Sequence, residues 1–354
     1  MKRSATSTRS IQSIASSRLT GVLLALLLAL LAWRVCLLPL PFLQVVGPLM
    51  PAMLLGLLLS SCLKPSLRSR LQPGLSFARN RLLRVGIVLY GFRISLADLQ
   101  QVGMTALLTD LLVVMSTLAV AAWIGIRWLR LDSRTALLVG AGSAVCGAAA
   151  ILATAPVVRA RNSDISVAIA TVVLFGSAAM MLYPILYTLP EIQQLFNYSE
   201  LAVGRLVGAT VHEVAQVAAA AQSLEAGAAH AAVITKMIRV MLLAPVLFGL
   251  SYWLNRKSNQ QNDGARVNVP WFALVFLLMP WLNSGAWIPE AWLNRVLQAD
   301  TLLLAVAMAA LGLDTHIGAV IKAGRRPLLL GAILFIFLLL CGVGLTVVLG
   351  NRFG

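Results

Sequence analysis

One stretch of this sequence places polar and ionisable side chains inside an otherwise apolar segment. In VGATVHEVAQVAAAAQ, residues 207–222, these are Thr210, His212, Glu213 and Gln216. His212 and Gln216 are four residues apart and would share a helix face, with Glu213 about 100° away. An ionisable group within a membrane is costly unless it is paired or hydrated. The stretch therefore predicts a polar cavity in which Glu213 or His212 carries a proton; a hydrogen-bonded cluster that joins helices is the alternative.

A second stretch, GAGSAVCGAAAILATAP at residues 140–156, combines small residues with signals that interrupt a helix. Its glycines lower helix propensity, and its terminal proline lacks a backbone donor. A broken helix here would expose N–H groups at the start of its second half, where an anion can bind. A packing face of small residues between helices is the equally weighted alternative. The candidate substrate-binding residues in this stretch are Gly142, Ser143, Cys146 and Gly147.

The letters HEVAQ also permit an enzyme hypothesis. Zinc proteases use H-E-x-x-H, in which two histidines one turn apart bind the metal and the glutamate activates water. Gln216 replaces the second histidine, and neither His230 nor His316 has the spacing to substitute for it. A metal-dependent hydrolase is therefore the weaker alternative, and we expect no catalytic residue, metal or cofactor.

Other charges lie within or beside apolar segments. Arg93 could hold an anion through its two-pronged guanidinium, and Asp110 and Asp314 could hold a coupling proton or cation. Lys236 and Arg239 are one turn apart, and we place them near the outer end of a span, where they would anchor it. Arg93 thus joins Thr210, His212 and Gln216 as a substrate candidate, and Asp110 and Asp314 join Glu213 as coupling candidates.

The composition identifies the class of protein that must position these residues. Of 354 residues, 60% are hydrophobic and only 11% are charged, about half the charged fraction of a soluble domain. The net charge of +16 comes mostly from loops between apolar segments and from the N-terminal tail. Basic loops of this kind are held in the cytoplasm and orient a membrane protein. Because this accounts for the positive charge, we expect no nucleic-acid partner.

Apolar segments predict an all-α polytopic membrane protein of about 10–11 spans. A basic cytoplasmic tail, residues 1–18, precedes an uncleaved first helix, because no cleavage site follows it. With eleven segments, the C-terminus would be periplasmic. The segments are residues 19–33, 45–63, 82–100, 103–126, 136–158, 165–189, 203–222, 231–254, 269–285, 301–313 and 328–349.

One pair of loops conflicts with this topology. The basic RARNSD after Val158 would face out, and the acidic PEIQQLFNYSE would face in. The conflict disappears if residues 136–158 and 203–222 are re-entrant hairpins, and it weakens if they are broken helices that cross. The sequence does not choose between the two versions.

Weak internal similarity relates VGAGSAVCGAAA to VGATVHEVAQVA, and LYGFRISLADLQQVG to ALGLDTHIGAVIKAG. Inverted repeats that meet near the membrane midplane are typical of secondary transporters, although chance similarity between small-residue helices is a rival. With GAGSAVCGAAAI, GATVHEVAQV and LGLDTHI in this order, the chain resembles the YeiH family of bacterial inner-membrane proteins, to which sulfate export is ascribed.

The resemblance implies the fold of the bile-acid symporter and cation/proton antiporter superfamily, two inverted five-helix repeats with broken helices that cross. It treats the first helix, residues 19–40, as an addition to a single transporter domain spanning residues 19–354, with repeat halves of roughly 42–190 and 203–350. It leaves open whether HEV or GLD supplies the second broken element.

We therefore expect a secondary transporter in the bacterial inner membrane that exports a small inorganic or organic anion, such as sulfate. A proton or Na⁺ gradient would drive it, because no nucleotide-binding motif is present. A membrane protein without transport activity is the third hypothesis. The oligomeric state is open, and a homodimer is compatible with the sequence.

Overall fold

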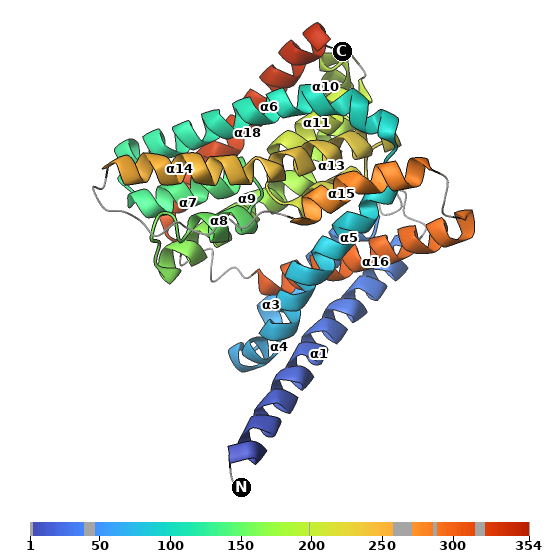
Figure 1. The fold of residues 1–354 in the computed structure, drawn as a ribbon, viewed down its shortest axis with the longest axis vertical. Coiled ribbons are helices and arrows are strands. Elements are labelled where there is room, and N and C mark those ends of the chain that lie inside the picture. Colours follow the sequence, from blue (N-terminus) through green and yellow to red (C-terminus); the bar gives the residue numbers. More distant parts are fainter. Residues whose placement is uncertain are drawn as a thin grey trace. The chain divides into compact units, whose positions relative to one another are not determined.

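The computed structural model describes residues 3–38, 47–197, 199–257, 271–285, 289–315 and 323–353. Within these ranges every regular element is a helix (Figure 1). The chain divides into two compact units, residues 1–93 with 285–317, and residues 94–284 with 318–354. The prediction of an all-α polytopic protein is confirmed.

The first unit combines the N-terminal helices with one helix from far along the chain. Its helices are α1 (Arg3–Cys36), α3 (Leu49–Cys62), α4 (Pro65–Phe77), α5 (Leu83–Tyr90) and α16 (Glu290–Asp314). Glycine permits its closest contact, because a Cβ on Gly56 of α3 would collide with the backbone of α16 at Ala309. Small residues therefore allow α3 and α16 to pack backbone against backbone, as in other membrane helices.

The second unit contains both polar stretches. Its helices are α6 (Leu96–Trp123), α7 (Ser133–Ala144), α8 (Ala148–Thr154), α9 (Asn162–Tyr187), α10 (Pro190–Leu195), α11 (Glu200–Thr210), α12 (Val214–Ala221), α13 (Ala226–Met241), α14 (Leu243–Lys257), α15 (Trp271–Ser284) and α18 (Arg325–Phe353). Helices α7 and α8 are separated by residues 145–147, and α11 and α12 by residues 211–213. Both predicted helix breaks are therefore present.

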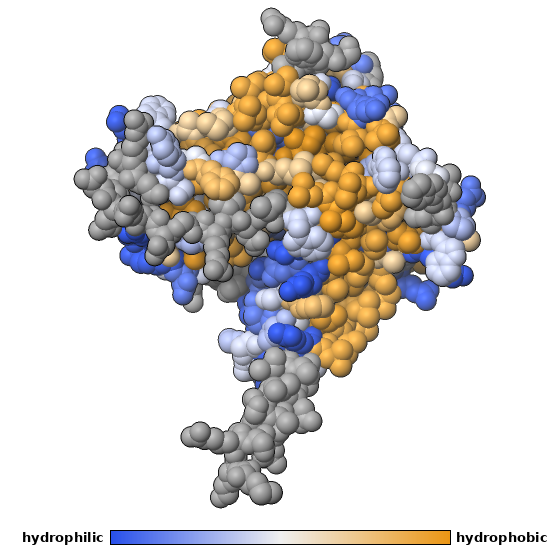
Figure 2. Space-filling model, viewed as in Figure 1, coloured by the Kyte–Doolittle hydropathy of each residue, from blue (hydrophilic) through white to orange (hydrophobic). Residues whose placement is uncertain are grey.

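The surface is that of a protein embedded in lipid. Six described helices are long and apolar enough to cross a membrane, among them α9 and α16. Large hydrophobic side chains on these helices face outward, including Leu27 (63% exposed) and Met115 (58% exposed). Figure 2 shows such side chains over much of the visible surface. Exposed apolar helices of this length are expected only where hydrocarbon surrounds them.

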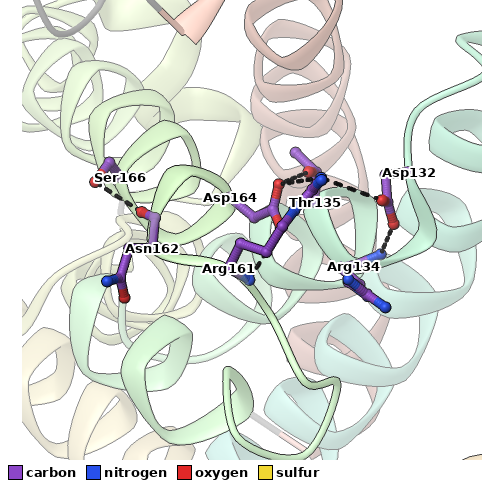
Figure 3. A network of polar contacts seen from close by, with 7 residues as sticks. All are labelled: Asp132, Arg134, Thr135, Arg161, Asn162, Asp164 and Ser166. Atoms are coloured by element: carbon purple, nitrogen blue, oxygen red, sulfur yellow. Dashed lines mark hydrogen bonds and ion pairs between the residues drawn. The ribbon is translucent and has the colours of Figure 1, made fainter.

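The α7–α8 segment is a hairpin, because its two ends lie together. Arg161 Nη2 lies 3.4 Å from Oδ2 of Asp132, the residue that caps α7. Its Nε lies 3.0 Å from Oδ2 of Asp164, which also accepts a hydrogen bond from Thr135 (Figure 3). Helix α7 alone is about 18 Å long, so a segment crossing the membrane in one direction could not bring its ends into contact.

The α11–α12 segment is a hairpin for the same reason. A Cβ on Gly227, after α12, would lie 2.5 Å from Oε2 of Glu200, in the first turn of α11, so the two ends of the segment lie side by side. Gln193 of α10 donates a hydrogen bond to the carbonyl oxygen of Tyr187, the last residue of α9, and only residues 188–199 separate α9 from α11. The base of this second hairpin therefore lies at the C-terminal end of α9.

The two hairpins enter from opposite ends of α9. The base of the first contacts Asp164 near the start of this helix, and the second hairpin begins at Glu200, 13 residues after the helix ends at Tyr187. A helix of 26 residues is about 39 Å long, more than the thickness of the hydrocarbon core. The hairpin version of the topology is therefore correct, and the crossing version implied by the family resemblance is not.

Candidate functional site

The hairpin tips meet, and Glu213 joins them. Its Oε1 accepts a hydrogen bond of 3.1 Å from the backbone N–H of Ala148, the first residue of α8. Gly147, just before, has φ +72°, and a Cβ there would collide with the Glu213 side chain. Only glycine combines this left-handed conformation with the close approach of the carboxylate. HEV, not GLD, is thus the partner of the glycine-broken stretch.

This contact changes the prediction for the exposed amides. We expected the N–H groups at the start of α8 to be available to a substrate anion. In the structure the negative group at the Ala148 N–H is the carboxylate of Glu213. A carboxylate is stabilised at a helix N-terminus by the same dipole that would attract a substrate, so the protein's own anion occupies this position.

Lys236 of α13 satisfies the opposite helix ends. Its Nζ donates hydrogen bonds of 2.7 Å each to the carbonyl oxygens of Val145 and Val211, the residues that end α7 and α11. The C-terminus of a helix carries partial negative charge, which an ammonium stabilises. One lysine thus holds the ends of two half-helices, while Glu213 holds the start of a third.

Gln216 is held in place by two contacts. Its Oε1 accepts from the backbone N–H of Glu213 at 3.3 Å, and its Nε2 donates to Ser177 Oγ of α9 at the same distance. A Cβ on Gly176 would collide with this amide, so glycine makes room for it. The amide therefore fixes the second tip against α9.

Arg239, one turn beyond Lys236, pairs with Asp110 of α6. The distance from Nε to Oδ1 is 2.8 Å, and both side chains are 0% exposed. Nη1 and Nη2 of Arg239 and Oδ2 of Asp110 have no hydrogen-bond partner among the described residues. Leaving donors of a buried charge unsatisfied is costly, so this guanidinium has capacity for a further acceptor.

Several of the further buried polar atoms without partners belong to residues at the hairpin tips or on α13. They are Oγ of Ser143, both ring nitrogens of His212 and Oγ1 of Thr235, all within the described ranges. His212 and Cys146 directly follow Val211 and Val145, the two residues whose carbonyl oxygens accept hydrogen bonds from Lys236. Groups from both polar stretches therefore lie around Lys236.

Three predicted candidates have other partners. Oγ1 of Thr210 is hydrogen-bonded to the Tyr183 hydroxyl and to the carbonyl of Leu206. In the first unit, Arg93 donates to Asp300 and Thr301, and Asp314 pairs with Arg79 and Gln72. These contacts use many of the hydrogen-bonding groups that each side chain would need to bind a substrate or a coupling ion.

The geometry around HEVAQ differs from that of a zinc protease. Among the described residues, no three His, Cys, Asp or Glu side chains are grouped so that they could hold a metal ion. Gln216, at the position of the second histidine, uses its amide to fix the hairpin tip. His316 lies outside the described residues.

Comparison with known proteins places the chain among relatives along most of its length. A family described as Conserved hypothetical protein 698 matches residues 20–331. A UPF0324 membrane protein of Yersinia pestis is 46% identical over 304 residues, which cover 85% of this chain and 84% of that protein. The UPF0324 inner membrane protein YeiH of Escherichia coli K12 is 43% identical over 299 residues, 84% of each chain. The chain belongs to the UPF0324 family. The resemblance to YeiH is thereby confirmed.

For this UPF0324 protein, two site residues were wrongly interpreted from sequence. Lys236 and Arg239 are not anchors near the end of a span, since both are fully buried. The apolar helical run extends over Ala226–Trp253, so it begins before the predicted start at residue 231 and places both cations well inside. Two cations within one apolar segment were the available signal, because such charges are rare in membrane helices unless they face an internal site.

Proposed function

We propose that this UPF0324 protein is a secondary transporter that exports a small oxyanion, with sulfate or a related anion as substrate. The observation that carries the proposal is the Arg239 guanidinium, fully buried and with two nitrogens unsatisfied among the described residues. A planar guanidinium binds an oxyanion through two parallel hydrogen bonds. His212, Ser143 and Thr235 would add neutral contacts that select the anion.

The charges of the site suggest how transport is coupled. Arg239 pairs with Asp110, and Lys236 and Glu213 both contact the hairpin tips, so the charges of the four side chains balance when all are ionised. An anion added to a balanced site is repelled by the two carboxylates. Protonation of Glu213 or Asp110 leaves one net positive charge, which attracts a monovalent anion or partly compensates a divalent one. Anion movement would then be linked to proton movement.

The two hairpins suggest how access could alternate. They approach from opposite ends of α9, and their tips are joined by Glu213 and Lys236. A site between opposed, discontinuous elements is the arrangement that secondary transporters use for alternating access. Separation of either tip would expose the Arg239 neighbourhood to one side of the membrane.

Transport in liposomes tests this function. Purified protein should move sulfate, sulfite or a sulfonate under an imposed proton or Na⁺ gradient. Arg239→Lys keeps the positive charge but removes the two-pronged donor, and should lower the rate by about 10-fold or more. Arg130→Lys, in the loop before α7, is the matched control. No flux of any of these anions under any gradient would refute the substrate assignment, and variants that changed only stability would indicate a scaffold without transport.

A further inference from the structure

A groove in the first unit lies between α1 and α16. None of the residues of the proposed anion site belongs to either helix. It has a volume of about 620 Å³, and its walls include Leu30, Trp33 and Arg34 of α1 and Arg295, Gln298 and Leu302 of α16. Trp33 and Arg34 lie three and four positions after Leu30, and Arg295, Gln298 and Leu302 follow each other at three and four positions, so each set lies on one helix face. A neighbouring cavity of about 490 Å³ shares Trp33 and Gln298.

Two guanidiniums at this groove have no acidic partner in the part of the chain that the structure describes. Arg34 and Arg295 are exposed, and neither forms an ion pair with any described residue. The contact recorded for Arg295 is with the ring of Trp292, 5.2 Å from the guanidinium carbon. Two cations on one groove therefore have donor capacity for an anion from outside the chain.

Apart from Gln298, the rest of the groove is apolar. Leu30 is 46% exposed, and Leu27, one turn further from Arg34, is 63% exposed. Trp33 provides an aromatic ring beside the cations, as is common where membrane helices meet the headgroup layer. The groove is therefore charged and aromatic at the end of α1 and hydrophobic along its length.

In the orientation predicted from the basic loops, α1 begins in the cytoplasm, so Arg34 in its last turn lies near the outer membrane surface. Basic residues are depleted on that side, and a pair there without acidic partners requires a specific reason. We infer that the groove between α1 and α16 binds one anionic phospholipid, with its phosphate between Arg34 and Arg295 and an acyl chain along Leu30 and Leu27. This site is independent of the proposed transport function.

Native mass spectrometry of the full chain in detergent tests the site. Phosphatidylglycerol and phosphatidylcholine with identical acyl chains are added at equal concentration. The wild type should retain the anionic lipid preferentially, and Arg34→Gln with Arg295→Gln should remove that preference, with roughly a fivefold loss for each arginine. Retention of phosphatidylcholine should not change.

The control is Arg70→Gln with Arg81→Gln, two exposed arginines of the same unit that are not at the groove. An equal loss in this variant would show that bulk charge attracts the lipid, and would overturn the proposal. So would retention of both lipids to the same extent by the wild type. Inorganic phosphate is added in a third experiment. If it raised the melting temperature of the wild type as the lipid does, and the two arginine substitutions removed this effect, the groove would bind free anions and the lipid proposal would be overturned. A melting temperature near that of the wild type shows that each variant is folded.

Discussion

The Glu213 carboxylate accepts a hydrogen bond from the backbone N–H of Ala148, although the two residues are 65 positions apart in the chain. This contact joins the tip of one hairpin to the tip of the other. It also places an ionisable group at a helix N-terminus, where its charge is stabilised by the dipole. Proton uptake at Glu213 would weaken the junction, because a protonated carboxyl is a poorer acceptor.

Replacing Glu213 by Gln should separate coupling from folding. The amide retains an oxygen that can accept from Ala148, but it cannot exchange a proton. We therefore expect proton-driven anion flux to fall by about 100-fold, as for loss of a positioned acid–base group, with only a small fall in melting temperature because a neutral amide oxygen is a weaker acceptor than the carboxylate. Flux and melting temperature are measured on the same preparation. Proton-driven flux equal to that of the wild type would exclude Glu213 as the coupling residue.

Lys236→Met should destabilise the junction of the hairpins. Methionine has a similar length but donates no hydrogen bond, so the carbonyls of Val145 and Val211 would lose their common donor. We expect a loss of about 2 kcal/mol in unfolding free energy, since removal of a buried ammonium offsets part of the cost. Thermal unfolding in detergent measures this, with Lys64→Met, an exposed lysine, as control. A melting temperature unchanged from the wild type would show that the two hydrogen bonds contribute nothing net.

Gly147→Ala should be destabilising, whereas Gly103→Ala should not. Gly147 has φ +72° and no room for a Cβ beside Glu213, and the strain should cost about 1–3 kcal/mol. Gly103, inside α6, has nothing within 4 Å of its Cβ position, so alanine there should be neutral or slightly favourable. Equal melting temperatures for the two variants would contradict the close approach of the hairpin tips.

Cysteine labelling should detect the hairpins directly. In a variant lacking the four native cysteines, single cysteines at Arg130 and Asn162 should react with an impermeant maleimide from one side of the membrane. A cysteine at Glu191 should react from the other side, because the chain has by then passed along α9. Labelling of positions 130 and 162 from opposite sides would restore the crossing topology.

The base of the second hairpin should weaken as the pH rises. A hydrogen bond shared with Glu225, assisted by partial burial, raises the pKa of Glu200 above its ordinary value. A raised carboxyl pKa means that the folded protein holds this proton more tightly than the unfolded chain does. The stabilisation is therefore complete below the unfolded pKa and is lost as the pH rises through the folded value. Glu200→Gln should flatten this part of the profile of melting temperature against pH, and an identical slope in both proteins would contradict the shared proton.

Several properties of this protein follow from sequence alone because they depend on local composition. Hydropathy and sparse charge identify a polytopic membrane protein, and Gly147 together with the HEV letters marks where two helices break. The direction in which the chain leaves each break is not local, since it depends on contacts such as that of Arg161 with Asp132. A hydropathy window cannot distinguish a hairpin from a crossing helix of the same composition.

The identity of the charged partners was decided only by tertiary structure. From the sequence we expected Glu213 and His212 in a polar site. We also expected the backbone N–H groups at the start of α8 to bind a substrate anion, and Lys236 and Arg239 to anchor the end of a span. Folding brings the Glu213 carboxylate to those amides and buries both cations beside Asp110. The physical reason is that a charge in a membrane must find its partner in three dimensions, and the partners here come from helices up to 129 positions apart in the chain.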